Sequence, residues 1–278
     1  MNKRPIDDRT LEQILDWEER FFAHVPSDLE HTSLKWTNWA FSKLGRAKQQ
    51  LFLSQIDTLI IHIQAWLHNG RSHEETTKRI IQHARVFNHQ IQDLKDLQLL
   101  NLEQLEYIVE QQMARQRLLA FSQGGLTGMG GAFFMAADLP AMVAINIRSI
   151  QQLAFTYGYN LDEPVEMMMA LKLFHLTSLP KAFQEEAWLQ LFEDVEIHRD
   201  QNLFYQGKEG IIEAEWLANL VKQVGKNLAI SMLRKKMIQG VPLIGMAFGA
   251  GMNYRFAKQV IEISHMFYKK RFIMENYR

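Results

Sequence analysis

The feature that most limits the possible folds is the nearly uncharged stretch from Leu126 to Ile147, which is rich in glycine and alanine. It is long enough to cross a bilayer as a helix. However, it contains Asp138, and a carboxylate near the middle of a membrane span is unfavourable by roughly 2.5–3.5 kcal/mol on insertion scales. The stretch therefore favours a buried hairpin, or an element that enters a membrane reversibly, over a fixed transmembrane helix.

Residues Asp138–Pro140 have the order of a helix start, with a carboxylate at the N-cap and a proline in the first turn. This order predicts two helical segments that meet at Asp138. The second segment is expected over 139–157 and ends at Gly158. Residues Asp162–Pro164 repeat the pattern and predict the start of another helix.

The rest of the chain shows helical periodicity and no alternating strand pattern. Asn101 and Gln104 form a capping box that predicts the start of one of these helices. We expect an all-α, multi-helix bundle with a central pair of glycine-rich apolar helical segments and no sheet. Residues 1–99 are expected to form a helical lead-in packed on a core of 100–278, as one integrated domain. The further helices are expected over 11–25, 34–44, 47–68, 72–87, 101–124, 181–200, 211–236 and 243–270.

The composition excludes several classes of chemistry. The chain has no cysteine, which rules out disulfides, thiolate zinc sites, iron–sulfur clusters and a cysteine nucleophile. It contains no P-loop, no G-x-S-x-G, no H-E-x-x-H and no EF-hand loop, so we expect no cofactor and no metal. The N-terminus is polar with no apolar segment of a signal peptide after it, which predicts a cytoplasmic location.

Charge is balanced only in total: basic and acidic residues number 31 each. Residues 160–215 carry a net charge of −8, whereas residues 216–278 carry +9. The acidic segment could fold against the basic one, or the basic segment could face an anionic lipid surface, a nucleic acid or a protein. The zero net charge gives no indication of a nucleic-acid partner. The candidate basic surface consists of Arg234, Lys235, Lys236, Arg255 and Lys258.

Two glycine pairs have the spacing of a close helix contact: Gly124 with Gly128, and Gly245 with Gly249. Residues four apart share a helix face, and a face without side chains lets two backbones approach closely. We expect the segment from Gly124 to Gly131 to pack against the segment from Gly245 to Gly251. The contact could be ordinary core packing, or it could belong to a hairpin that enters a membrane or docks on a transmembrane partner.

Four polar residues stand among small and apolar neighbours: Asp138, Asn146, Arg148 and Asn253. Buried polar groups need partners, because an unpaired buried charge is unfavourable by several kcal/mol. The four residues could form a structural polar lock, hold the head group of a ligand, or take part in catalysis.

The segments Ala136–Pro140, Asn146–Arg148 and Tyr157–Tyr159 resemble the core signature of the EcsC family, and Pro242–Asn253 resembles its second signature. The resemblance covers roughly Leu100 to Met266. The family is named for a protein encoded beside the ATPase and permease subunits of an ABC transporter. The resemblance therefore implies an intracellular helical protein that works with a membrane exporter, and it implies no catalytic residues.

The expected function is that of a non-enzymatic accessory or interaction protein, cytoplasmic and peripheral to the inner face of the cell membrane. Its expected partners are ABC transporter subunits and an anionic membrane surface. One alternative is a soluble binding module that holds a lipid or another apolar ligand between the glycine-rich helices. A second alternative is an enzyme that uses Asp138 and Arg148 on an unknown substrate.

Overall fold

A computed structural model describes residues 8–23, 70–127, 131–161, 163–179, 181–201 and 244–277. These residues form helices and contain no sheet, which confirms the predicted all-α class for this part of the chain. The expected helices at 34–44, 47–68 and 211–236 lie outside the described residues. The helices are α1 (Asp8–Phe22), α4 (Gly70–Ala84), α5 (Leu102–Thr127), α6 (Gly131–Thr156), α7 (Pro164–Ser178), α8 (Gln184–Gln201) and α10 (Ile244–Asn276), with short 3₁₀ turns at Lys95–Leu99 and Lys181–Phe183.

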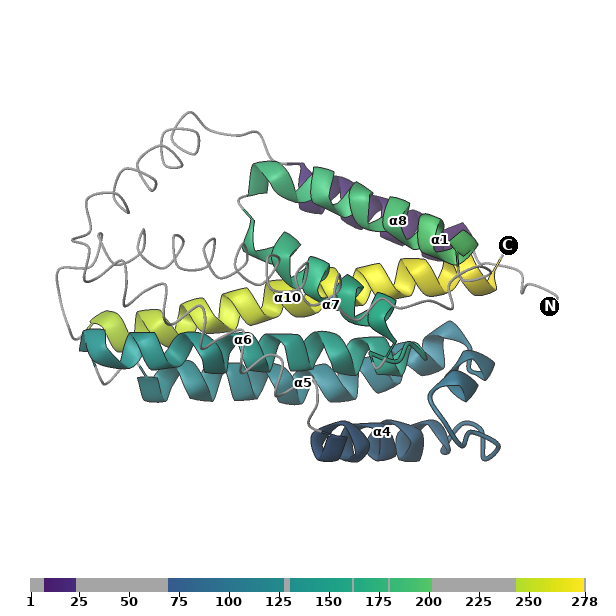
Figure 1. Ribbon diagram of the computed structural model, residues 1–278, viewed down its shortest axis with the longest axis horizontal. Coiled ribbons are helices and arrows are strands. Elements are labelled where there is room, and N and C mark those ends of the chain that lie inside the picture. The colour runs from purple at the N-terminus through teal and green to yellow at the C-terminus, as the bar shows by residue number, and fades with distance from the viewer. Residues whose placement is uncertain are drawn as a thin grey trace.

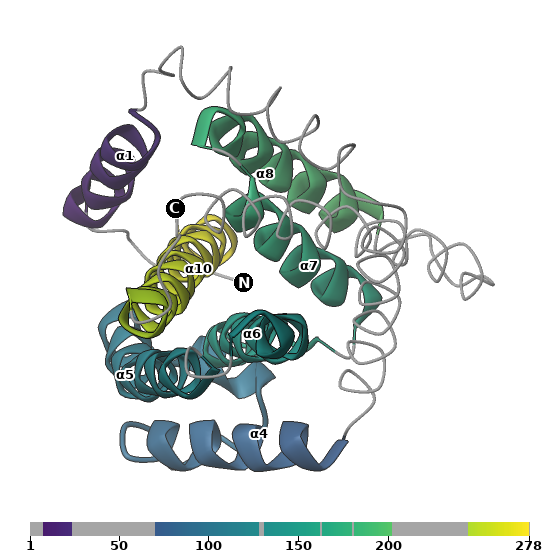
Figure 2. The same ribbon diagram turned by 90° about the vertical axis from the view of Figure 1, so that its left-hand side faces the viewer.

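The three long helices α5, α6 and α10 pack along one another and form the centre of the molecule (Figure 1). Helix α7 packs on α6 and α10, and α8 packs on α7. Helix α4 lies across α5 and α6 on the other side of the bundle, as the view along the long helices shows (Figure 2). Buried side chains from α4 to α10 form one continuous hydrophobic core.

The start of α5 follows the predicted capping box. The backbone N–H of Gln104 donates to Asn101 Oδ1 at 2.9 Å, and the backbone N–H of Asn101 donates to Gln104 Oε1 at 3.0 Å. Each side chain thus satisfies a backbone donor that the first helical turn leaves without a partner. The helix then continues through Gly124 to Thr127.

The predicted break at Asp138 is wrong. Helix α6 runs without interruption from Gly131 to Thr156 and passes through both Asp138 and Pro140. Proline inside a helix removes one backbone hydrogen bond, which is why the pattern suggested a boundary. Helix α6 packs on α5 and α10, and tertiary packing can override a local preference of this kind.

The turn between α6 and α7 behaves as predicted. Helix α6 ends before Gly158, whose φ of 87° is the only positive one among the described residues. Glycine adopts this left-handed conformation without the steric penalty that a Cβ imposes. The amide of Tyr159 donates to Ala154 O at 2.9 Å, and Pro164 occupies the first turn of α7, which begins after Glu163.

Helix α1 attaches to the bundle through aromatic side chains. Trp17 contacts Trp188 of α8 with ring centroids 5.5 Å apart, and its indole N–H donates to Glu262 of α10 at 2.9 Å. The indole N–H of Trp188 donates to Glu18 at 2.8 Å. These contacts anchor an element from the start of the chain on two helices that lie late in the sequence.

In the parts of the chain that the structure describes, no helix combines the length and the apolarity that a membrane span requires.

Candidate functional site

Three consecutive cations near the C-terminal end of α10 pair with three different helices. Lys269 pairs with Glu106 of α5 at 2.5 Å, and Lys270 pairs with Glu18 of α1 at 2.6 Å. Arg271 pairs with Glu166 of α7. Since consecutive residues project about 100° apart around a helix, adjacent cations on α10 reach partners on separate sides. The described part of the basic segment is therefore partly matched within the fold, although only Glu166 of these carboxylates belongs to the acidic segment.

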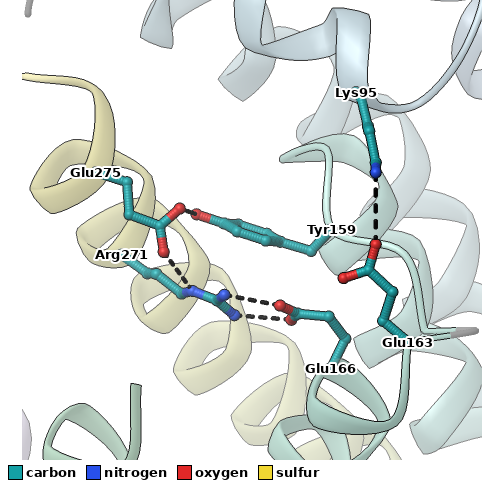
Figure 3. A network of polar contacts seen from close by, with 6 residues as sticks. All are labelled: Lys95, Tyr159, Glu163, Glu166, Arg271 and Glu275. Atoms are coloured by element: carbon teal, nitrogen blue, oxygen red, sulfur yellow. Dashed lines mark hydrogen bonds and ion pairs between the residues drawn. The ribbon is translucent and has the colours of Figure 1, made fainter. Parts of the chain in front are cut away.

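The pair between Arg271 and Glu166 is bidentate (Figure 3). Nη1 and Nη2 of Arg271 donate to the two carboxylate oxygens of Glu166 at 2.7 Å each. The side chains are 11% and 7% exposed. Paired N–H donors on both carboxylate oxygens make the strongest and most directional form of ion pair in proteins.

Glu275 and Tyr159 extend this pair into a network (Figure 3). Arg271 Nε donates to Glu275 Oε1 at 2.8 Å, and the hydroxyl of Tyr159 donates to Glu275 Oε2 at 3.0 Å. The guanidinium carbon of Arg271 also lies 4.0 Å from the centroid of the Tyr159 ring, the geometry of a cation–π contact. At the edge of the network, Lys95 Nζ lies 3.7 Å from Glu163 Oε1 in an exposed pair.

Burial dominates the electrostatics of these groups. Burial raises the pKa of the Glu166 carboxyl above its usual value, and the hydrogen bonds and charge of Arg271 offset this only in part. For Arg271, burial acts to lower the pKa, but the hydrogen bonds and charge of Glu166 outweigh it and raise the pKa. Burial and the charge of Glu275 raise the pKa of Tyr159 well above its usual value.

All four carboxylate oxygens of Glu166 and Glu275 accept a hydrogen bond within the network. A general base needs an oxygen that is open to a substrate proton. The network is therefore suited to fixing the ends of α6, α7 and α10 relative to one another rather than to proton transfer. The described residues also contain no group of three histidine or acidic side chains that could hold a metal ion.

Three buried polar atoms lie beside these ion pairs without a hydrogen-bond partner in the described chain: the hydroxyls of Tyr157 and Tyr268, and Nε2 of His265. The rings of Tyr157 and His265 stack with centroids 6.1 Å apart. Burial lowers the pKa of His265 to about 4, and the charges of Lys269 and Arg117 act in the same direction against Glu106. The imidazole is therefore neutral at pH 7.

The interface between α5 and α6 is partly polar. Gln116 Nε2 donates to Gln152 Oε1 at 2.9 Å, and both residues are buried. A buried amide pair joins two helices at a defined register, because a shift of either helix would leave the amides without partners.

The polar lock predicted from the sequence remains a prediction. Asn146 is buried and donates through Nδ2 to Met142 O of its own helix at 2.7 Å, while its Oδ1 has no partner in the described chain. Arg148 is half-buried, and its Nε has no hydrogen-bond partner among the described residues. Asp138 lies ten residues before Arg148 on the same uninterrupted helix, about 15 Å along its axis. A site that used both residues would need a ligand or a third residue between them. The side chains of Asp138 and Asn253 are outside the described part.

The glycine contact also remains a prediction. Gly124 lies in α5, Gly131 begins α6, and Gly245 and Gly249 lie in α10, whereas Gly128 is outside the described residues. Helices α5 and α10 do pack on each other, as the predicted contact requires.

The predicted basic surface is described for two of its five members. Arg255 and Lys258 are exposed on α10. Arg234, Lys235 and Lys236 lie outside the described residues.

Sequence reasoning missed the central ion pair altogether. Glu166 and Arg271 are 105 positions apart, and no local pattern connects them. One local signal was present: Arg271 and Glu275 have the i, i+4 spacing of a helical ion pair. This spacing indicates an ion pair within the helix, but it gives no indication of the buried partner Glu166 on α7.

Comparison with known proteins gives a family match over nearly the whole chain. The profile of the EcsC protein family matches residues 8–273, which extends the resemblance seen in the sequence to α1. The "Uncharacterized protein YdbA" of Bacillus subtilis (strain 168) is 28% identical over 250 residues, which cover 85% of this chain and 87% of that protein. "Protein EcsC" of the same organism is 21% identical over 204 residues, which cover 72% and 78%. No solved structure matches.

Proposed function

Since this chain belongs to the EcsC protein family, we propose that it is a non-enzymatic accessory protein that associates with the anionic inner face of the cell membrane. We further propose that its membrane partners are the subunits of an ABC-type exporter. The membrane proposal rests on the surface of α10, and the exporter proposal rests on the family resemblance.

The observation that carries the membrane proposal is a short exposed stretch of α10. Tyr254, Arg255 and Lys258 are all exposed there. A lysine or arginine near an anionic lipid surface contributes about 1 kcal/mol of attraction, which falls off within a Debye length. Tyrosine is enriched at membrane–water interfaces because its ring is apolar and its hydroxyl is polar.

The ion pairs farther along α10 make this stretch distinct. Lys269, Lys270 and Arg271 are held by carboxylates of the fold. Arg255 and Lys258 are the exposed basic side chains of the described part of α10. Their segment, residues 216–278, carries a net charge of +9.

Flotation of the purified protein with liposomes tests the membrane proposal. We expect binding to vesicles that contain phosphatidylserine, little binding to phosphatidylcholine vesicles, and release at high salt. The Arg255→Glu/Lys258→Glu variant should lose most of this binding. The Lys78→Glu/Lys95→Glu variant changes the charge equally at two exposed lysines elsewhere and should keep it. Absence of flotation, or equal binding by both variants, would overturn the proposal.

The exporter proposal needs a separate measurement. Purified exporter subunits reconstituted in phosphatidylcholine vesicles remove the lipid charge from the comparison. We expect the protein to float with these vesicles and not with matched empty vesicles. Equal flotation with both would contradict the exporter partner and leave the membrane proposal to the first experiment.

A further inference from the structure

The outward face of α5 carries four exposed residues at heptad spacing: Tyr107, Gln111, Ala114 and Leu118. Their spacing of four, three and four residues is that of a coiled-coil seam. Tyr107 is 54% exposed and Leu118 is 65% exposed, large values for apolar side chains in a helix that packs on three others. Helix α5 contacts α10, α6 and α4 through its other residues, and the four seam residues are exposed.

Two charged residues flank the seam on one edge. Glu110 and Arg117 are seven positions apart, the length of one heptad, and both are exposed. No ion pair of the described chain uses either side chain. In an antiparallel pair of helices, residues at this flanking position of one helix lie opposite the same position of the other.

We propose that α5 is the interface of a symmetric dimer, in which a second copy of this chain packs its own α5 antiparallel on this seam. Leu118 then packs against the partner's Tyr107, and Gln111 packs against the partner's Ala114. Each of these contacts occurs twice, because a twofold axis relates the copies. The small Ala114 near the axis lets the two helices approach closely.

Charge complementarity favours a second copy as the occupant. In the same antiparallel register, Glu110 lies opposite the partner's Arg117, and the symmetry repeats this ion pair. The face thus supplies both members of each pair by itself, which a surface adapted to a uniformly charged partner would not do.

The apolar surface extends beyond the helix. The ring of Phe87, in the turn after α4, contacts the ring of Tyr107 with centroids 5.6 Å apart, and Val86 beside it is exposed. This extension places apolar side chains at both ends of the twofold contact. One seam of this length buries less area than a standard interface, so we expect a reversible dimer whose population depends on concentration.

The first test measures mass in solution. Light scattering after size exclusion, over a series of concentrations, should show a monomer–dimer equilibrium for the full chain. Leu118→Glu should weaken the dimer at least about tenfold, because it places a carboxylate in the apolar layer. Leu189→Glu on α8 is the matched control, since Leu189 is 59% exposed on another helix, and it should leave the dimer unchanged.

A charge-swap series tests the register. Glu110→Arg and Arg117→Glu should each weaken the dimer about tenfold through like-charge contacts, and the double variant should restore it. Because all these positions are exposed, unchanged melting temperatures are expected and separate loss of the dimer from loss of folding.

Cross-linking tests the helix contact directly, because the chain has no cysteine of its own. Ala114→Cys should cross-link efficiently with a short bismaleimide, whereas Leu189→Cys should not. A monomer at every concentration would overturn the proposal. The proposal would also be overturned if the dimer survived Leu118→Glu and the charge reversals. Equal cross-linking at positions 114 and 189 would overturn it too. Binding of a different purified protein through this face by a monomeric chain would identify another occupant and refute the second copy.

Discussion

Arg271 and Glu166 form two parallel hydrogen bonds of 2.7 Å that join the C-terminal part of α10 to the first turn of α7. The neighbouring Lys269 and Lys270 pair with α5 and α1. One turn of α10 therefore contacts carboxylates from three other helices, which come from the beginning, the middle and the later part of the chain. These ion pairs link this end of α10 to α1, α5 and α7.

Removing one partner of the central pair should destabilise the fold. Glu166→Gln keeps the size of the side chain but leaves Arg271 buried with less compensating charge. Loss of one member of a buried ion pair is unfavourable by roughly 3–5 kcal/mol, and Glu275 still pairs with Arg271, so we expect about 3 kcal/mol. Urea unfolding at pH 7, followed by circular dichroism, measures the change.

Glu163→Gln is the matched control for this variant, because it makes the same substitution just before the same helix. Glu163 pairs with Lys95, and both side chains are mainly exposed. Exposed pairs contribute about 0–1 kcal/mol, so the control should lose less than 1 kcal/mol. An equal loss in the free energy of unfolding for the two variants would show that the buried pair contributes no more to stability than the exposed one.

The helix ends near Asn101, Gly158 and Pro164 follow from short-range chemistry, which is why the sequence predicts them. The capping box, the left-handed glycine and the proline after a turn each involve residues within a few positions of one another. The prediction at Asp138 used the same reasoning and is wrong, because α6, which packs on α5 and α10, continues through Pro140. The Arg271 network could not be predicted from the sequence, because its partners are far apart along the chain and come together only when the bundle forms.

The capping box at the start of α5 provides a local stability prediction. Asn101→Ala removes the side-chain oxygen that accepts from the Gln104 backbone N–H. Loss of an N-cap side chain is unfavourable by about 1 kcal/mol. Thermal unfolding should show this loss, whereas Asn101→Asp retains the acceptor and should stay close to the parent protein. An alanine variant as stable as the parent would show that water replaces the cap without penalty.

We expect substitution of Gly158 by residues that carry a Cβ to lower the stability of the fold. Its φ is 87°, and a Cβ at this position would lie 3.0 Å from Leu94 O and 3.3 Å from Gln98 Cγ. Gly158→Ala is expected to lower stability by about 1–2 kcal/mol because of the left-handed backbone, with a further loss from the close contacts. Gly158→Asn brings the same Cβ but adopts this conformation more readily, so it should be less harmful than alanine. If asparagine and alanine are equally harmful, the contacts rather than the backbone conformation account for the loss.

His265 should make the fold sensitive to mild acid. Its pKa is about 4 in the folded protein because of burial, against about 6.5 in an unfolded chain. Between these values the unfolded chain binds a proton that the folded protein does not, so stability present above pH 6.5 is lost as the pH falls towards 4. The full difference corresponds to at most about 3 kcal/mol at 1.36 kcal/mol per pKa unit.

His265→Gln removes this titration, so its loss of stability between pH 7 and pH 4.5 in urea unfolding should be smaller than that of the parent protein. His175→Gln, at a less deeply buried histidine whose pKa burial also lowers, should flatten the pH dependence less. Parallel pH profiles for the parent and His265→Gln would show that this imidazole is not held neutral by the fold.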